Sequence, residues 1–141
     1  MFDLNGTYTH NVDAKGRVSL PAKFRKKLPT DLVVRYSMAG DCLYVFEEES
    51  HNEWVASFFK KEGGYDPLDS QHVAFRSMLK GEAKDVSQDS AGRILLPADM
   101  RKKVGIEKEA VLVGNTGYFE VWNPQRREEA FAHMDLASFM H

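Results

Sequence analysis

Length, composition and charge narrow the class of protein. The chain has 141 residues, of which 43% are hydrophobic and 28% are charged, a balance typical of a globular protein rather than a disordered one. No apolar run approaches the roughly 18–20 residues of a membrane helix, and the first residues lack the basic start and apolar centre of a signal peptide. A single cysteine, Cys42, excludes an internal disulfide framework. We therefore expect a globular protein of the reducing cytoplasm.

One line of the sequence occurs twice. Residues 13–28 (DAKGRVSLPAKFRKKL) and residues 89–104 (DSAGRILLPADMRKKV) lie 76 positions apart and share nine of sixteen residues without a gap. The segments that follow the repeated line, residues 32–46 and 108–122, are related by the same offset. Both predict two short strands around a glycine-containing turn. The sequence therefore predicts an internal duplication.

Each half begins with a strand that leads into the repeated line. Residues 6–12 and 81–88 are these strands, and each runs into the aspartate of a D-x-x-G-R turn. A short strand, a short helix and the two further strands complete each half. We expect a mainly β protein with appended helices, of the α+β class.

A short helix follows each turn. Pro21 and Pro97 stand where a helix begins, since the first turn needs no N–H donor. Each helix then ends in Lys-Lys, which suits the negative end of the helix dipole. Pro29 stops the first helix and Gly105 the second.

Three amphipathic segments are appended to the halves. Residues 48–61 and 69–79 predict two helices separated by the Gly and Pro residues of 63–67, and residues 123–140 predict a third that opens on an Asn cap. Their aromatic residues either cover the sheet or form contacts between subunits; they are Trp54, Phe58, Phe59, Phe131 and Phe139. The expected organisation is a first half with its helix (1–62), a helical connection (63–80) and a second half with its helix (81–141).

Positive charge is concentrated in the repeated line. Residues 13–28 carry six Lys/Arg against one Asp, and residues 89–104 carry four against two, although the whole chain has a net charge of −2. Two basic patches thus lie on an otherwise acidic protein. Local patches, rather than the mean charge, decide which polyanion binds.

The D-x-x-G-R turns are the candidate anion sites. Asp13 and Asp89 shape a turn by accepting backbone N–H groups, and each lies four residues before an arginine, Arg17 or Arg93. Arginine suits bidentate contact with phosphate or guanine. A purely structural Asp–Arg pair remains the alternative for each turn taken singly.

The two copies differ in charge. Lys15 of the first turn corresponds to Ala91, and Lys23 of the first short helix corresponds to Asp99. We therefore expect the first copy to be the stronger anion site. The short helices add Lys23, Arg25 and Arg101 to the basic candidates.

No enzyme signature is present. The five histidines form no H-x-H or H-E-x-x-H pattern and no pairing with cysteine, and no nucleophile elbow or phosphate-binding glycine loop occurs. Cys42 lies in an apolar strand-like segment, which predicts a buried thiol. We expect no catalytic residue, metal or cofactor.

The doubled pattern D-x-x-G-R-[VI]-x-[LI]-P-A-x-x-R-x-x-[LV] resembles the MraZ family, whose members contain two AbrB-like (SpoVT-AbrB) halves. The resemblance extends to RSMLKGEA between the halves and to LVGNTGYFEVWNP in the second. It implies a β-barrel with swapped hairpins built from the two halves of one chain. It also implies a sequence-specific transcriptional regulator that binds repeated elements upstream of the division and cell-wall gene cluster.

The resemblance implies partners and site residues as well. The expected partners are double-stranded DNA and further copies of the chain, in a ring of eight or more subunits associated with the nucleoid. The residues expected to face DNA from the two turns are Asp13, Lys15, Arg17, Asp89 and Arg93. A protein-binding adaptor of the AbrB-like antitoxin type is the alternative, although such proteins usually combine one half with a disordered tail.

Overall fold

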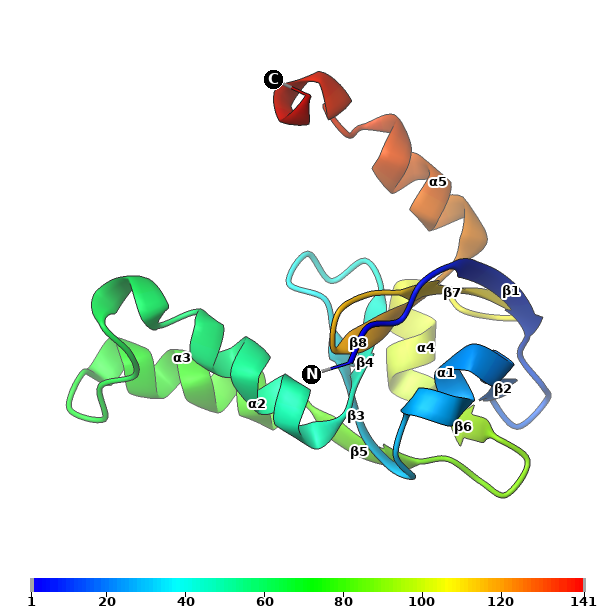
Figure 1. Cartoon of the computed structure of the whole chain (residues 1–141), viewed down its shortest axis with the longest axis horizontal. Helices are drawn as coiled ribbons and strands as arrows, with labels where there is room; N and C mark the ends of the chain where they lie inside the picture. Colours follow the sequence, from blue (N-terminus) through cyan, green and yellow to red (C-terminus); the bar gives the residue numbers. More distant parts are fainter. Residues whose placement is uncertain (1, 141) are drawn as a thin grey trace.

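The computed structural model describes residues 2–140 and arranges their strands in two antiparallel sheets (Figure 1). Six strands form one sheet in the order β1-β7-β8-β4-β3-β5, and two strands form the other, the β2–β6 ribbon. The strands are β1 (Thr7–Asn11), β2 (Arg17–Ser19), β3 (Asp31–Tyr36), β4 (Leu43–Phe46), β5 (Lys84–Ser87), β6 (Arg93–Leu95), β7 (Glu109–Gly114) and β8 (Tyr118–Trp122).

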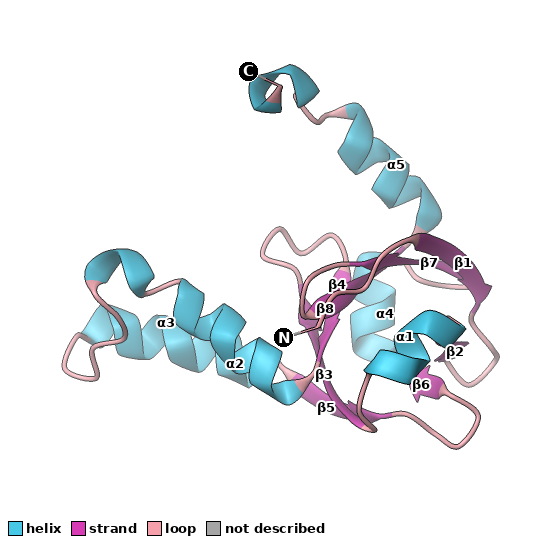
Figure 2. Ribbon diagram, viewed as in Figure 1, coloured by secondary structure: helices cyan, strands magenta, loops and turns pink. Residues whose placement is uncertain are grey.

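Helices occupy the positions between and after the strands, which confirms the α+β class (Figure 2). No helix in residues 2–140 is long and apolar enough to span a bilayer. The helices are α1 (Ala22–Lys27), α2 (Glu48–Ser57), α3 (Ser70–Gly81), α4 (Ala98–Val104) and α5 (Pro124–Ala132), with 3-10 turns η1 (Lys60–Glu62) and η2 (Leu136–Phe139).

The two halves are intertwined rather than side by side. β1 pairs with β7, β2 with β6, β3 with β5 and β4 with β8, so each strand of one half has a partner in the other. Val18 pairs with Ile94 and Tyr44 pairs with Glu120, and both pairs join positions 76 residues apart. A pseudo-twofold axis therefore passes through these two pairs, and the exchange of hairpins between the halves is confirmed.

The expected closure into a barrel is wrong. The six-stranded sheet is open, with β1 and β5 at its edges. Each edge is linked to the β2–β6 ribbon by one isolated bridge, Val12–Val18 on one side and Gln88–Ile94 on the other. The turns 13–16 and 89–92 lie directly between these segments and redirect the chain, so continuous ladders cannot form there.

The short helices begin and end where the sequence predicts. Pro21 and Pro97 immediately precede α1 and α4. Leu28 after α1 is extended, as expected for a residue before proline, and Gly105 closes α4 in the left-handed conformation at φ 76°.

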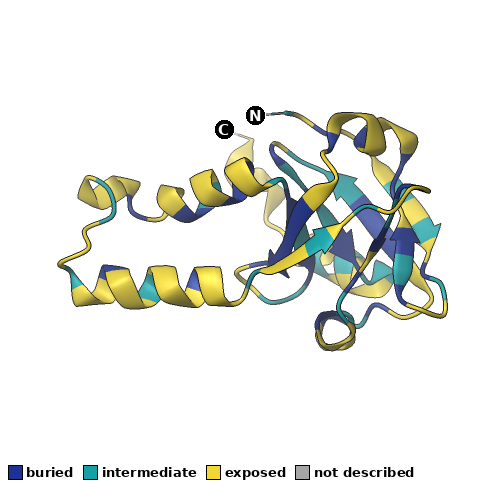
Figure 3. Cartoon of the chain, turned by 90° about the horizontal axis from the view of Figure 1, so that it is seen from below, coloured by how far each residue is buried: buried dark blue, intermediate teal, exposed yellow. Residues whose placement is uncertain are grey.

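The core lies between the large sheet, the ribbon and the short helices (Figure 3). Val18 and Ile94 of the ribbon are fully buried, as are Phe24 of α1 and Met100 of α4. The inward residues of the ribbon thus fix it to the rest of the fold, while its other face stays outside.

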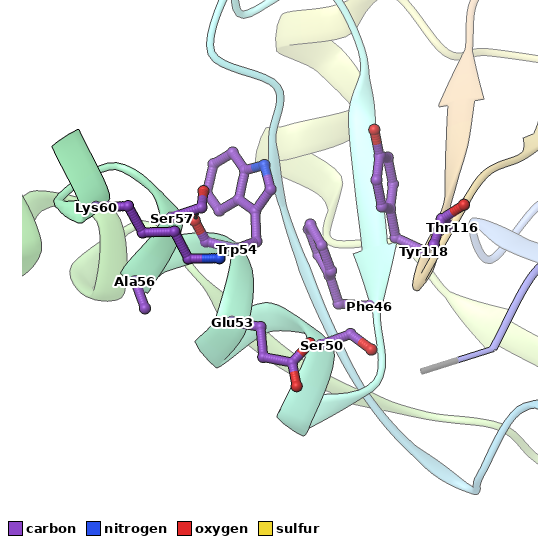
Figure 4. A pocket seen from close by; sticks show the side chains of 9 residues that line it. All are labelled: Phe46, Ser50, Glu53, Trp54, Ala56, Ser57, Lys60, Thr116 and Tyr118. Atoms are coloured by element: carbon purple, nitrogen blue, oxygen red, sulfur yellow. Dashed lines mark hydrogen bonds between the residues drawn. The ribbon is translucent and has the colours of Figure 1, made fainter. Parts of the chain in front are cut away.

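The helices α2 and α3 form an arm that extends from the sheet (Figure 1). Phe59 is buried in it, with its ring centroid 5.9 Å from that of Phe75 on α3. Trp54 packs instead on the sheet, 5.6 Å from Phe46 (Figure 4). These aromatic residues of the arm therefore cover their own chain.

The segment 123–140 differs from the prediction of a single helix. Asn123 caps α5 as expected, since its side chain accepts from the N–H of Arg126, but the helix ends at Ala132. Neither α5 nor η2 contains a buried residue. Its apolar face therefore remains exposed.

Candidate nucleic-acid interface

The first turn is built around the carboxylate of Asp13. Its Oδ1 accepts the backbone N–H groups of Lys15 at 3.0 Å and Arg17 at 2.9 Å. Its Oδ2 accepts Nε of Arg17 at 2.8 Å. The N–H of Arg17, followed by its side chain and the N–H of Lys15, lowers the pKa of Asp13 below its usual value. The predicted Asp–Arg contact is thus confirmed.

The second turn repeats this geometry. Asp89 accepts from the N–H of Ala91 at 2.9 Å, from the N–H of Arg93 at 3.0 Å, and from Arg93 Nε at 2.8 Å. The same donors, the N–H of Arg93 first, lower the pKa of Asp89. In both turns the aspartate binds the side chain of the arginine through Nε only. Among the described residues, no group hydrogen-bonds to the terminal nitrogens of Arg17 or Arg93, which leaves them available for a ligand.

Both arginines lie on the outer face of the β2–β6 ribbon. Arg17 pairs with Leu95 and Ser19 pairs with Arg93, whereas Val18 and Ile94 point into the core. The two arginines are therefore diagonal neighbours across the ribbon, on the order of 7–8 Å apart. Ser19 and Leu95 complete this face and are exposed. Sequence reasoning missed these two residues, although the alternation around Val18 and Ile94 indicates them.

Arg25 and Arg101 each reach from a short helix to the turn of the opposite half. Arg25 of the first half reaches the second turn, where its Nη2 donates to Ser90 O at 2.8 Å and its Nη1 to Ala91 O at 3.3 Å. Arg101 of the second half lies over the first turn, where its guanidinium is so near Gly16 that a Cβ there would lie 2.4 Å from Nη2. Each arginine therefore supports the turn of the opposite half.

The glycines of the turns are required by this arrangement. Gly16 and Gly92 have φ of 87° and 74°, in the left-handed region that other residues rarely adopt. Their carbonyl oxygens accept the N–H groups of Leu96 and Leu20, so each turn also hydrogen-bonds to the strand end of the other half. The turns are thereby fixed to the ribbon.

The lysine candidates stand on exposed positions. Lys15 is exposed in the first turn, where Ala91 takes its place in the second. Lys23 is exposed on α1 and lines a shallow groove together with Lys26 and Lys27. Asp99, its counterpart on α4, is paired with Lys84 at 2.8 Å. The first half therefore presents more unpaired positive charge.

A cluster of Glu62, Asp69 and His72 lies at the end of the arm, with its ligand atoms within 4.8 Å of one another. His72 Nδ1 accepts the backbone N–H of Asp66 at 3.0 Å, so the neutral ring carries its proton on Nε2, toward Glu62. A metal would need Nε2 unprotonated, which this backbone hydrogen bond opposes. The cluster fits a hydrogen-bonded link between η1 and α3 better than a metal site.

Cys42 is buried, as predicted, and burial raises the pKa of its thiol far above the usual range. A thiol with so high a pKa is a poor nucleophile. Nothing about Cys42 therefore indicates catalysis.

Comparisons with known proteins agree with this geometry. The model of the family described as "MraZ protein, putative antitoxin-like" matches residues 4–63 and 78–141, one segment in each half. A protein of Rickettsia felis named "Transcriptional regulator MraZ" is 38% identical over 126 residues, which cover 86% of this chain and 82% of that protein.

Relatives with the same name occur in two further organisms. The protein of Lachnoclostridium phytofermentans is 34% identical over 131 residues, covering 92% of this chain and 89% of the relative. The protein of Thermomicrobium roseum is 36% identical over 120 residues, covering 85% and 81%. Both turns and the swapped pairing of strands lie within the matched segments, and the chain belongs to the MraZ family.

Proposed function

We propose that the protein is a sequence-specific DNA-binding regulator of transcription. The observation that carries this proposal is the outer face of the β2–β6 ribbon, where Arg17 and Arg93 project side by side with their terminal nitrogens unoccupied. The name of the relatives, transcriptional regulator, supports the same function.

The ribbon has the dimensions and chemistry for the major groove of DNA. This groove admits a two-stranded β-ribbon, and arginine forms bidentate contacts with guanine there. Each aspartate holds Nε of its arginine, which aims the two terminal nitrogens outward before DNA arrives. Less side-chain freedom is then lost on binding. Ser19 can donate to a base or phosphate, and Leu95 can contact a thymine methyl.

Lysines of the first turn and of α1 supply the sequence-independent part of binding in this proposal. Lys15 and Lys23 are exposed near the first turn and on α1, and we assign them to phosphate groups. Such contacts position the protein, while contacts with base edges specify the sequence. The aspartates Asp13 and Asp89 act through their arginines rather than by touching DNA.

The outer face of the ribbon in one chain offers two arginines, with few lysines near them, so its binding at physiological salt is weak. Several copies in a closed ring would engage repeated DNA elements together, and affinity then rises through effective concentration. We propose such an assembly on the nucleoid. From the family resemblance, we propose its targets as the repeats upstream of the division and cell-wall gene cluster.

The experiment that tests this function is a selection of random double-stranded DNA with the purified protein at two salt concentrations. We expect a short motif to be enriched, repeated at a fixed spacing, with weaker recovery at higher salt. A variant with Arg17→Ala and Arg93→Ala should enrich nothing. If the wild-type protein also enriches no motif, the DNA-binding proposal is wrong and the adaptor function is favoured.

A further inference from the structure

The outer face of the β2–β6 ribbon carries one large apolar side chain. Leu95 is 53% exposed there, and within residues 2–140 it is the one large apolar residue that is exposed on a strand. The other exposed large apolar residues of this range lie in the turn after β3, in the arm and beyond residue 130. Leucine at position 95 buries only part of its apolar surface, so folding alone gives little reason for it.

Internal symmetry provides a comparison for this position. Ser19 lies 76 residues before Leu95 in the equivalent place on the ribbon, and it pairs with Arg93 as Leu95 pairs with Arg17. The same backbone position therefore accepts a small hydroxyl side chain in the other half. The leucine is a property of the outer face and not a requirement of the fold.

Leu95 lies directly beside Arg17. The backbone hydrogen bond from Leu20 N to Gly92 O, 2.9 Å long, lies three positions along the ribbon from this pair. Since alternate pairs of an antiparallel ladder are hydrogen-bonded, the pair of Arg17 and Leu95 is a non-hydrogen-bonded one, with Cβ atoms about 4.5–5.5 Å apart. Successive base pairs are about 3.4 Å apart. A guanine bound by Arg17 thus places Leu95 near the next one or two base pairs.

The two ends of the outer face differ in charge as well. The turn that precedes Arg17 contributes the exposed Lys15, so this lysine belongs to the same end as Leu95. At the other end, Ala91 stands in place of the lysine and Ser19 in place of the leucine. The arginines follow the pseudo-twofold symmetry, but their neighbours do not. Such a face distinguishes the two orientations in which DNA can lie across it.

We propose that Leu95 is a specificity-determining residue, whose side chain contacts the methyl group of a thymine beside the guanine bound by Arg17. The inference rests on the proposed DNA binding and names the base that one end of the ribbon selects. The thymine methyl is the apolar group that base edges present in the major groove, and apolar side chains recognise it. Ser19 can donate or accept a hydrogen bond, so the other end tolerates more than one base.

A structural role is the alternative for Leu95, since an apolar neighbour can pack on the aliphatic stem of an arginine. Such packing would position Arg17 for its guanine, whatever base comes next. Only direct contact makes the affinity depend on the thymine methyl. Deoxyuridine lacks this methyl group and keeps the same base pair, so replacing thymidine by deoxyuridine separates the two roles.

The test uses the DNA element selected by the wild-type protein, with each thymidine replaced in turn by deoxyuridine. We expect one replacement, beside a guanine, to weaken wild-type binding about three- to fivefold, the effect of losing one apolar methyl contact. Leu95→Ser should bind the thymine and uracil forms equally, and it should stay folded because Ser19 occupies the equivalent position, which thermal unfolding checks. Leu68→Ser, at a 94% exposed position in the arm, which points away from the ribbon, is the control and should keep the wild-type ratio (Figure 1).

An exchange of the two residues gives a second readout. The double variant Ser19→Leu with Leu95→Ser retains both arginines, and a selection with it should move the thymine preference to the Arg93 end of the element. The role of Leu95 would be overturned by an element without thymine beside guanine or by equal wild-type affinity for the thymine and uracil forms. A wild-type ratio in Leu95→Ser, or an unchanged element after the exchange, would also overturn it.

Each of these results leaves DNA binding by the ribbon intact, because the wild-type protein still selects an element. If the wild type selects no element at all, the proposed function fails, and the role of Leu95 fails with it. The two failures are therefore distinguishable.

Discussion

Arg25, on the short helix of the first half, donates from its guanidinium to the carbonyl oxygens of Ser90 and Ala91 in the turn of the second half. Arg101 lies in the equivalent place over Gly16 of the first turn and also donates from Nε to Leu96 O at 3.0 Å. Each turn is therefore shaped by the aspartate of its own half and supported by an arginine of the other. Neither half forms its turn alone.

Arg25→Ala should loosen the second turn. Two hydrogen bonds from an exposed guanidinium are lost, at a cost of about 1 kcal/mol in the free energy of unfolding. Backbone amide exchange of residues 89–92 should accelerate, and DNA affinity should fall several-fold. Lys26→Ala removes the same charge from the same helix and is the control. Equal exchange rates in the two variants would show that Arg25 does not support the turn.

Gly16→Ala should destabilise the protein more than Gly40→Ala. Both glycines have positive φ, 87° and 75°, but a Cβ at Gly16 would meet the Arg101 guanidinium, whereas a Cβ at Gly40 would meet nothing within 4 Å. Strain in the left-handed conformation costs about 1–2 kcal/mol at either position, and the displacement of Arg101 adds to it at Gly16. Chemical unfolding measures both values. Adding Arg101→Ala should bring the cost at Gly16 down to that at Gly40; an unchanged difference would contradict the contact.

Arg35→Lys should detach the α2–α3 arm from the sheet. The buried guanidinium donates to Tyr36 O at 2.9 Å, to Leu79 O at 2.6 Å and to Glu82 Oε2 at 3.2 Å. A lysine ammonium lacks the planar fork of donors through which one guanidinium reaches all three acceptors. We expect a loss of about 2–3 kcal/mol in the free energy of unfolding, because buried acceptors lose their donors.

The control for this change is Lys84→Met, which breaks the exposed pair with Asp99. Exposed pairs contribute about 0–1 kcal/mol, so its effect should be small. If the two variants unfold at the same denaturant concentration, Arg35 does not anchor the arm.

His51 should make stability depend on pH between about 4 and 6.5. Burial, followed by the nearby charges of Lys80 and Arg35, lowers the pKa of His51 to about 4, and its Nε2 has no hydrogen-bond partner. Since the unfolded chain binds the proton near pH 6.5 and the folded chain only near pH 4, the free energy of unfolding falls as the pH drops through this window.

The variant His51→Leu tests this dependence. Its melting temperature should fall less than that of the wild type between pH 7 and pH 5. His133→Leu, at an exposed position, is the control and should follow the wild type. If His51→Leu loses as much on acidification as the wild type, the buried histidine is not the cause.

The features that the sequence predicts well are those encoded in neighbouring residues. The hydrogen bonds of Asp13 to Lys15 and Arg17 span four positions, and Pro97 and Gly105 delimit α4 directly. Local turn and cap chemistry decides these elements with little help from the rest of the chain. The duplication then extends each prediction to the second half.

The features that it predicts poorly depend on contacts between distant residues. Arg25 and its acceptor Ser90 are 65 positions apart, so no local pattern predicts this hydrogen bond. The exposure of Phe131 is also not predictable from the sequence, since an amphipathic stripe usually faces its own core. The open sheet arises because the ribbon meets its edges through single bridges, which no local pattern specifies.

The most direct test of the DNA-binding face is the affinity for the selected DNA at several salt concentrations, measured for Arg17→Ala, Arg93→Ala and the wild type. We expect Arg17→Ala to abolish specific binding, with a loss of affinity of at least about tenfold at each salt concentration, because a contact with base edges is removed. Arg93→Ala should have a similar or smaller effect. Arg76→Ala, which removes an exposed arginine of the arm, should bind as the wild type does. Wild-type affinity of Arg17→Ala for the selected DNA would contradict the assignment of the ribbon as the DNA-binding face.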